Sequence, residues 1–259
     1  MGQEVYALEA QGLVCDFNGF RAVGGANGVD LRVRSGSIHA LIGPNGAGKT
    51  TCFNLLTRFI EPTAGRIRFE GRDITGLAAD AVARLGLVRS FQISAVFAQL
   101  SVFENVRLAL QRKRGHSFDW WRSDKVLTQH DARTHELLAE VGLDAWARHL
   151  AGELPYGRKR ALELATTLAL EPRMLLLDEP MSGMGGEDIA HASELIRVAA
   201  RGRTVLMVEH NLLVVADLCD YITVLAQGEV LAEGDYASIA ANEHVAQAYL
   251  GRARHRAHG

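Results

Sequence analysis

The sequence predicts an α/β fold built on a mostly parallel sheet, and three observations favour it. An apolar run at residues 38–42 is followed directly by the glycine-rich segment 43–50, the order of a buried strand, a turn and a helix. From residue 162 onward, apolar runs that suit buried strands alternate with helical periodicity. Between residue 93 and about residue 152 the periodicity is helical, with no convincing strand. An α/β core with an inserted helical lobe is therefore expected.

The elements follow in order along the chain. Alternating segments at 7–10, 29–33 and 66–69, separated by glycine-rich turns, predict an antiparallel sheet beside the strand at 38–42. After the helical lobe, the pattern predicts a helix to about residue 170, a strand at 174–177, a helix at 189–199 and a strand at 204–208. We assign residues 1–92 and 162–250 to the core with its antiparallel β-subdomain, 93–161 to the helical subdomain, and the basic segment 251–259 to a flexible tail.

Composition limits the function classes. The 259 residues are 48% hydrophobic and 22% charged with a net charge of −2, which is globular composition and argues against nucleic acid as a partner. No run approaches the ~20 apolar residues of a membrane span, and the N-terminus lacks a signal peptide pattern, so a soluble, intracellular chain is expected. Its three cysteines are far apart, which favours neither a zinc site nor a disulfide framework.

Residues 43–50 form a complete P-loop, the sequence of a nucleoside triphosphate binding site. Its three glycines allow the backbone NH groups to converge on the β-phosphate, where a Cβ atom would obstruct some positions. Lys49 is expected to reach the β- and γ-phosphates, and the Thr50 hydroxyl to ligate Mg²⁺. The predicted nucleotide-binding residues of this segment are Gly43, Pro44, Asn45, Gly46, Ala47, Gly48, Lys49, Thr50 and Thr51.

Further polar residues follow predicted strands. Asp178 and Glu179 end the apolar run 175–177, where a parallel sheet exposes ligand-facing residues. Asp178 suits a Mg²⁺ contact, and Glu179 suits a general base that orients the attacking water. Gln92 is a candidate Mg²⁺ ligand where the core gives way to the helical lobe, and His210 could hydrogen-bond the γ-phosphate.

The order of these parts resembles the ATP-binding cassette of ABC transporters over nearly the whole chain. It runs from the P-loop through Gln92, a helical insert and Leu154-Pro155-Tyr156-Gly157 to Leu177-Asp178-Glu179-Pro180 and Glu209-His210. The resemblance implies a P-loop NTPase (RecA-like) core with an N-terminal antiparallel β-subdomain and an inserted α-helical subdomain. Lys49, Glu179 and His210 are then the catalytic residues, with ATP and Mg²⁺ bound.

The resemblance also implies two features outside the P-loop. Residues Leu154, Pro155, Tyr156, Gly157 and Arg158 occupy the place of the family's signature, which faces the ATP bound by a partner subunit. The match is imperfect, because Pro155 removes a serine hydroxyl and a backbone NH, and an ordinary surface basic cluster is the alternative.

An aromatic residue ahead of the P-loop is the second implied feature. Phe17 is the candidate for stacking on adenine, as it lies in the segment where the family places a Tyr or Phe. Phe20 competes for the same role.

Several segments are similar to the ATPase subunits of branched-chain (hydrophobic) amino acid importers, among them 39–46, 178–184, 209–212 and 228–234. This similarity implies an ATP-hydrolysing subunit at the cytoplasmic face of the (inner) cell membrane, bound peripherally. Its partners would be a second ATPase subunit, identical or different, two transmembrane permeases and a periplasmic or extracellular solute-binding protein. Trp120 and Trp121 in the long insert are either core anchors or part of the permease-facing surface.

A soluble single-cassette ABC ATPase in a cytosolic assembly complex is the alternative function. The length of the chain does not exclude it.

Overall fold

A computed structural model describes residues 5–90, 96–112 and 130–255. The chain divides into two compact units. The first unit comprises residues 1–89, 174–180 and 202–259, and the second comprises residues 90–173 and 181–201. In the described ranges no helix is both long and apolar enough to span a membrane.

The central sheet of the first unit has six strands in the order β11-β10-β4-β9-β8-β7. The pairs β10–β4, β4–β9 and β9–β8 are parallel, and β11 pairs antiparallel with β10. Val208 lies opposite both Leu41 and Asp178, so β4, β8 and β9 end at the same edge of the sheet. The strands are β4 (Ile38–Ile42), β7 (Leu87–Ser90), β8 (Met174–Asp178), β9 (Thr204–Val208), β10 (Tyr221–Ala226) and β11 (Glu229–Gly234).

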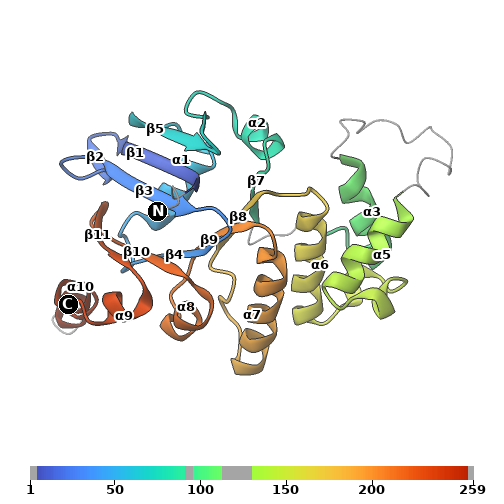
Figure 1. The fold of residues 1–259 in the computed structure, drawn as a ribbon. Coiled ribbons are helices and arrows are strands. Elements are labelled where there is room, and N and C mark those ends of the chain that lie inside the picture. The colour runs from blue at the N-terminus through green and yellow to red at the C-terminus, as the bar shows by residue number, and fades with distance from the viewer. Residues whose placement is uncertain (1–4, 91–95, 113–129, 256–259) are drawn as a thin grey trace. The chain divides into compact units, whose positions relative to one another are not determined.

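A second, antiparallel sheet belongs to the same unit. Strand β1 (Tyr6–Phe17) pairs with β2 (Phe20–Val23), β3 (Val29–Arg34) and β5 (Ala64–Phe69), and β5 pairs with β6 (Arg72–Asp73). Helix α1 (Lys49–Leu56) packs between this sheet and the central one, where its apolar side chains join residues of both sheets in one core (Figure 1). Helix α2 (Ala79–Arg84) also belongs to this unit. The predicted α/β core with an antiparallel subdomain is confirmed.

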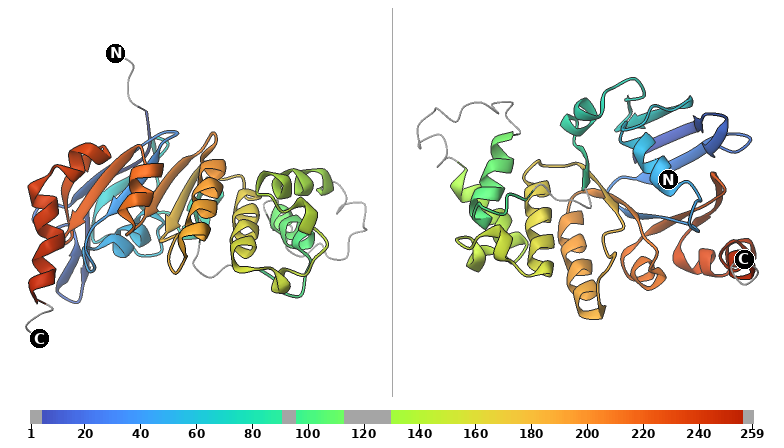
Figure 2. Two further views of the ribbon diagram at one scale, coloured as in Figure 1. Left: turned by 90° about the horizontal axis from the view of Figure 1, so that it is seen from below. Right: turned by 180° about the vertical axis from the view of Figure 1, so that it is seen from behind.

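The opposite face of the central sheet is covered by the C-terminal helices. Helices α8 (Leu212–Leu218), α9 (Tyr236–Ala240) and α10 (Glu243–His255) contribute Val215, Ile239 and Val245 to a core with β4 and β10. Figure 2 shows α9 and α10, in red, beside β10 and β11 in both views. Helix α10 continues through residues 251–255, which we expected to belong to the flexible tail.

The second unit is helical, as the periodicity predicts. Helix α3 packs against α5 and α6, and α6 packs against α7. Because α6 and α7 pack together, compactness groups both with this unit, although the sequence places residues 162–250 in the core. Its elements are α3 (Val102–Arg112), α5 (Asp131–Glu140), η2 (Asp144–Trp146), η3 (Ala151–Glu153), α6 (Tyr156–Leu168) and α7 (Gly186–Ala200).

Candidate active site

The loop between β4 and α1 has a backbone that only glycine adopts easily. Gly43, Gly46 and Gly48 have φ values of 149°, 78° and 98°. A Cβ atom on Gly43 would lie 2.1 Å from the carbonyl oxygen of Leu225, and one on Gly48 would lie 2.7 Å from that of Ala22. Neighbouring backbone therefore requires two of these glycines, in addition to any ligand.

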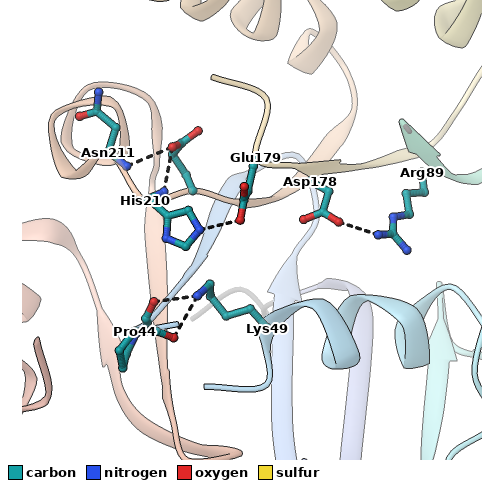
Figure 3. Close-up of polar contacts among 9 residues, drawn as sticks. Pro44, Lys49, Arg89, Asp178, Glu179, His210 and Asn211 are labelled. Carbon is teal, nitrogen blue, oxygen red and sulfur yellow. Dashed lines mark hydrogen bonds and ion pairs between the residues drawn. The ribbon is translucent and has the colours of Figure 1, made fainter. Parts of the chain in front are cut away.

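Lys49 opens helix α1 with its ammonium group folded back over the loop. The side chain is buried, and Nζ donates hydrogen bonds to the carbonyl oxygens of Gly43 at 2.8 Å and Pro44 at 3.2 Å (Figure 3). A buried cation needs such acceptors, because losing its hydration is costly. A phosphate oxygen offers the same ammonium a stronger, charged acceptor.

Asp178 ends β8 in an ion pair with Arg89 of β7. The Arg89 Nη2 atom lies 2.5 Å from Oδ2 of Asp178, and the two side chains are only 13% and 12% exposed. The Nη1 atom of Arg89 donates to the side-chain oxygen of Asn54 on α1 at 2.5 Å. Figure 3 shows the contact between Arg89 and Asp178. With its bond to Asn54, the guanidinium joins the carboxylate strand to the helix that follows the phosphate loop.

Glu179 has an unusual backbone and a specific partner. Its φ is 48°, a left-handed conformation that costs free energy in a residue other than glycine, and its NH still donates to the carbonyl of Val208 at 3.0 Å. The Oε1 atom lies 2.6 Å from Nε2 of His210 (Figure 3). The turn therefore directs the carboxylate to the histidine at the end of the neighbouring strand.

His210 is held by the turn that follows β9. Glu209 is buried, and its Oε1 atom accepts hydrogen bonds from the backbone NH groups of His210 at 2.8 Å and Asn211 at 3.0 Å. The side chain of Asn211 in turn caps α8 by accepting from the NH groups of Leu213 and Val214. The backbone that carries the imidazole is consequently held by the Glu209 carboxylate and by the cap of α8.

A second histidine, His39, lies in β4 just before the phosphate loop and is fully buried. Its Nε2 atom lies 2.8 Å from Oγ1 of Thr223, whose hydroxyl donates to Glu233. The threonine oxygen must therefore accept from His39, so Nε2 carries the hydrogen. Burial, with a smaller contribution from the charge of Arg34, lowers the pKa of His39 to about 4.

Oxygen ligands for a divalent cation are available at this edge of the sheet. Thr50 is exposed in the first turn of α1, and the Asp178 carboxylate ends β8. A hydroxyl and a carboxylate are hard donors of the kind Mg²⁺ prefers. The third predicted ligand, Gln92, lies outside the described residues, as do Trp120 and Trp121. Among the residues that are described, no group of three or more His, Cys, Asp or Glu side chains converges to hold a metal.

The two aromatic candidates for adenine stacking lie at the tip of the β1–β2 hairpin. Phe17 and Phe20 are register partners, 44% and 69% exposed. Arg21 on β2 pairs with Asp16 on β1 at 2.9 Å, which lowers the pKa of Asp16 and fixes the hairpin. Because register partners share one face of a β-ribbon, both rings remain candidates.

The signature residues belong to the second unit. Leu154 is buried, Pro155 is the N-cap residue of α6, and Tyr156 is 50% exposed. The guanidinium of Arg158 stacks on the Trp146 ring at 4.0 Å from its centroid. Pro155 forms no side-chain capping bond, and the first turn of α6 holds no acidic residue.

The basic cluster after the signature is partly neutralised. Arg160 pairs with Glu163 at 2.7 Å and donates to the Tyr156 hydroxyl. Only part of the positive charge that the sequence places at this helix start is therefore available to an external anion.

The first unit thus brings most predicted site residues to one edge of the central sheet. The phosphate loop, Asp178, Glu179 and His210 follow strands that end there. Sequence reasoning missed Arg89 and its bond to Asn54. The available signal was an arginine in an apolar strand segment, because a buried arginine needs an acidic partner.

Comparison with known families agrees with this geometry. Residues 26–182 match the family described as ABC transporter, and residues 229–255 match the family described as Branched-chain amino acid ATP-binding cassette transporter.

Individual relatives cover nearly the whole chain. It is 39% identical to the high-affinity branched-chain amino acid transport ATP-binding protein BraF of Pseudomonas aeruginosa, over 95% of this chain and 98% of the relative. It is 38% identical to the corresponding protein LivG of Salmonella typhimurium, with the same coverage. Among solved structures, the ADP conformation of MJ1267, an ATP-binding cassette of an ABC transporter, superposes with a TM-score of 0.81 at 27% identity, over 96% of this chain and 100% of that one.

Proposed function

The chain belongs to the ABC transporter family, within it to the ATP-binding proteins of the branched-chain amino acid subgroup, and on this premise we propose how its site works. It binds and hydrolyses ATP to energise the uptake of branched-chain or related amino acids through partner permeases. The observation that carries this proposal is the convergence of a sterically enforced phosphate loop, Asp178 and the Glu179–His210 pair on one edge of the sheet.

Phosphate binding falls to the loop and Lys49. The left-handed glycines orient backbone NH groups as an anion site, and α1 adds the positive end of its dipole. The Lys49 ammonium exchanges its carbonyl acceptors on Gly43 and Pro44 for phosphate oxygens. Phe17 supplies a stacking surface for adenine.

Proton transfer falls to Glu179, with His210 as its orienting partner. An ionised carboxylate only accepts hydrogen bonds, so Nε2 of His210 donates to Oε1 of Glu179. This bond leaves Oε2 to accept the proton of the water that attacks the γ-phosphate. The left-handed backbone at Glu179 and the Glu209 turn keep the two side chains together.

Thr50 and Asp178 would hold Mg²⁺, together with Gln92. When bound, the ion supplies positive charge at the β- and γ-phosphate oxygens. Hydroxyl and carboxylate donors suit this hard cation.

The complete site includes a second subunit. The signature residues 154–158 contact the ATP held by a partner cassette, which is either a second copy or a related ATPase. Two transmembrane permeases and a periplasmic or extracellular solute-binding protein complete the assembly, at the cytoplasmic face of the membrane. Closure of two cassettes on ATP, and reopening after hydrolysis, drives the permeases between their two states.

Copurification tests the transport assignment against the soluble alternative. The tagged chain, expressed in its native cell, is expected to be recovered from detergent-solubilised membranes with hydrophobic permeases. Recovery only in a cytosolic complex, with no permease, would instead support an assembly ATPase. The solute class is then read from the associated binding protein, whose unfolding temperature rises with the amino acid it retains.

A further inference from the structure

Arg89 binds one oxygen of the Asp178 carboxylate, which is the proposed Mg²⁺ ligand. Its Nη2 atom lies 2.5 Å from Oδ2 of Asp178, in a pair whose side chains are nearly buried. A divalent cation at this carboxylate would have to use Oδ1 or displace the guanidinium. In the first case the cation would lie close to a fixed positive charge, and in the second the ion pair would be lost.

The position of Arg89 is fixed on several sides. Nη1 donates to Asn54 of α1 at 2.5 Å, and the guanidinium lies over the rings of Phe53 and Phe59 at 5.9 and 5.8 Å from their centroids. These contacts come from α1 and the turn after it, while Arg89 itself lies on β7. The guanidinium therefore cannot turn away from Asp178 without losing contacts on α1 as well.

A fixed guanidinium and a divalent cation compete for the same carboxylate. The repulsion between them is strong where side chains are nearly buried, because the local dielectric constant is low. ATP changes the balance, since its phosphates add negative charge and oxygen ligands for the cation.

We propose that Arg89 is a positioning residue that keeps Asp178 from binding a divalent cation until the cation arrives with the nucleotide. It orients the carboxylate through Oδ2 and neutralises its charge, so that the protein alone is a poor metal site. The metal then enters as the nucleotide complex, which is the form that the reaction requires. This inference rests on the nucleotide site proposed above.

The test measures binding of Mn²⁺, which shares the ligand preferences of Mg²⁺, to the nucleotide-free chain by the loss of the free-ion electron paramagnetic resonance signal. Arg89→Met is expected to bind Mn²⁺ about 10-fold more tightly than the wild type, because the competing charge is gone. Arg89→Lys, which keeps the charge, is expected to remain within about threefold of the wild type. Adding Asp178→Asn to Arg89→Met should abolish the gain.

Arg66→Met is the matched control, because it removes the same charge from an exposed pair with Asp73 in the same unit. Its Mn²⁺ affinity should equal that of the wild type. Since Arg89→Met leaves a nearly buried carboxylate without its partner, circular dichroism must first show that the variant folds. If it does not, Asn54→Ala, which keeps both charges and removes one anchor, should raise the Mn²⁺ affinity about threefold.

Mn²⁺ affinity that stays at or below the wild-type value in the folded Arg89→Met and Asn54→Ala variants overturns the inference. Metal-free ATP affinity, measured in EDTA, tests the nucleotide site separately. If the wild-type chain does not bind ATP, the proposed function is contradicted. If the wild-type chain binds ATP but the Mn²⁺ affinity of Arg89→Met equals that of the wild type, only the role of Arg89 is contradicted.

Discussion

The phosphate loop of the first unit and the signature segment of the second differ in the space that surrounds their glycines. A Cβ atom would clash with backbone in the phosphate loop and would not clash at Gly157. At Gly43 and Gly48, a Cβ atom would lie within 2.1 and 2.7 Å of backbone carbonyl oxygens of the same unit. At Gly157, the nearest atom to a Cβ would be Oδ1 of Asp188 at 3.8 Å, which is ordinary contact.

The difference separates a glycine requirement set by the fold from one that the proposed function would set. The backbone of its own unit requires glycine at Gly43 and Gly48 of the phosphate loop, whether or not a ligand is bound. In the part of the second unit that the structure describes, no neighbouring atom requires glycine at position 157. If the proposed function is right, a requirement for glycine at 157 would come from the ATP of a partner subunit.

Among the substitutions near the phosphate loop, Glu179→Gln is expected to have the largest effect, which is on the rate of ATP hydrolysis. The amide keeps the size of the side chain and loses the proton acceptor, so ATP hydrolysis should fall about 10³-fold while ATP affinity is retained. Phosphate release and equilibrium binding of ATP check the two parts. A variant that hydrolyses ATP at the normal rate would remove Glu179 from the chemical step.

The ATP affinities of Lys49→Ala and Lys159→Ala compare the phosphate loop with the signature segment, because Lys49 begins α1 and Lys159 lies on α6. Loss of the charged hydrogen bonds from Lys49 should weaken ATP binding to the isolated chain about 10²-fold. Lys159 belongs to the signature side, and its removal should leave that affinity unchanged. Isothermal titration of both variants measures the contrast, and equal losses would contradict the separation of the two halves.

The pH dependence of stability reports on the strand that carries the phosphate loop. The pKa of His39 is about 4 in the folded chain, against 6.5 for an ordinary histidine. Between these pH values the unfolded chain binds a proton that the native chain does not. The free energy of unfolding should therefore fall by about 1.6 kcal/mol as the pH drops from 6.5 to 5.

His39→Gln is the control for this effect. Its amide is neutral throughout this range and can still donate to Thr223. Urea unfolding at a series of pH values should show a smaller slope for this variant, and identical slopes would show that His39 is not the group responsible.

Phe17→Ala is expected to have the smallest effect on ATP binding. It tests whether the nucleotide site extends from the phosphate loop to the β1–β2 hairpin. Loss of a stacking surface should weaken ATP binding about 10-fold and leave inorganic pyrophosphate binding unchanged. Phe20→Ala is the matched variant, because it removes the register partner. A greater loss in Phe20→Ala would reassign the adenine contact to that ring.

Much of this arrangement could be predicted from local patterns. The run at 38–42 followed by the loop, and the run at 175–177 followed by two carboxylates, each encode a strand and its ligand-facing end within a few residues. The motif residues Lys49, Asp178 and His210 were assigned for the same reason. Helix α10 was harder, because the basic composition of residues 251–255 gave no periodic signal.

The rest depends on contacts between distant segments. Arg89 and Asp178 are 89 positions apart, and Gly43 meets the carbonyl of Leu225, which follows it by more than a hundred residues. No spacing rule predicts such pairs from one sequence. Likewise, the left-handed backbone of Glu179 appears only in the structure.

The most direct test of the central claim compares Gly43→Ala with Gly157→Ala in the assembled complex. Gly43→Ala should lower the stability of the chain and its ATP affinity together, because its Cβ atom meets the Leu225 carbonyl. Gly157→Ala should leave stability and single-chain ATP affinity at or above wild-type values, and lower ATP hydrolysis by the assembled complex about 10-fold or more. Hydrolysis at the wild-type rate in Gly157→Ala would contradict a site shared between two subunits.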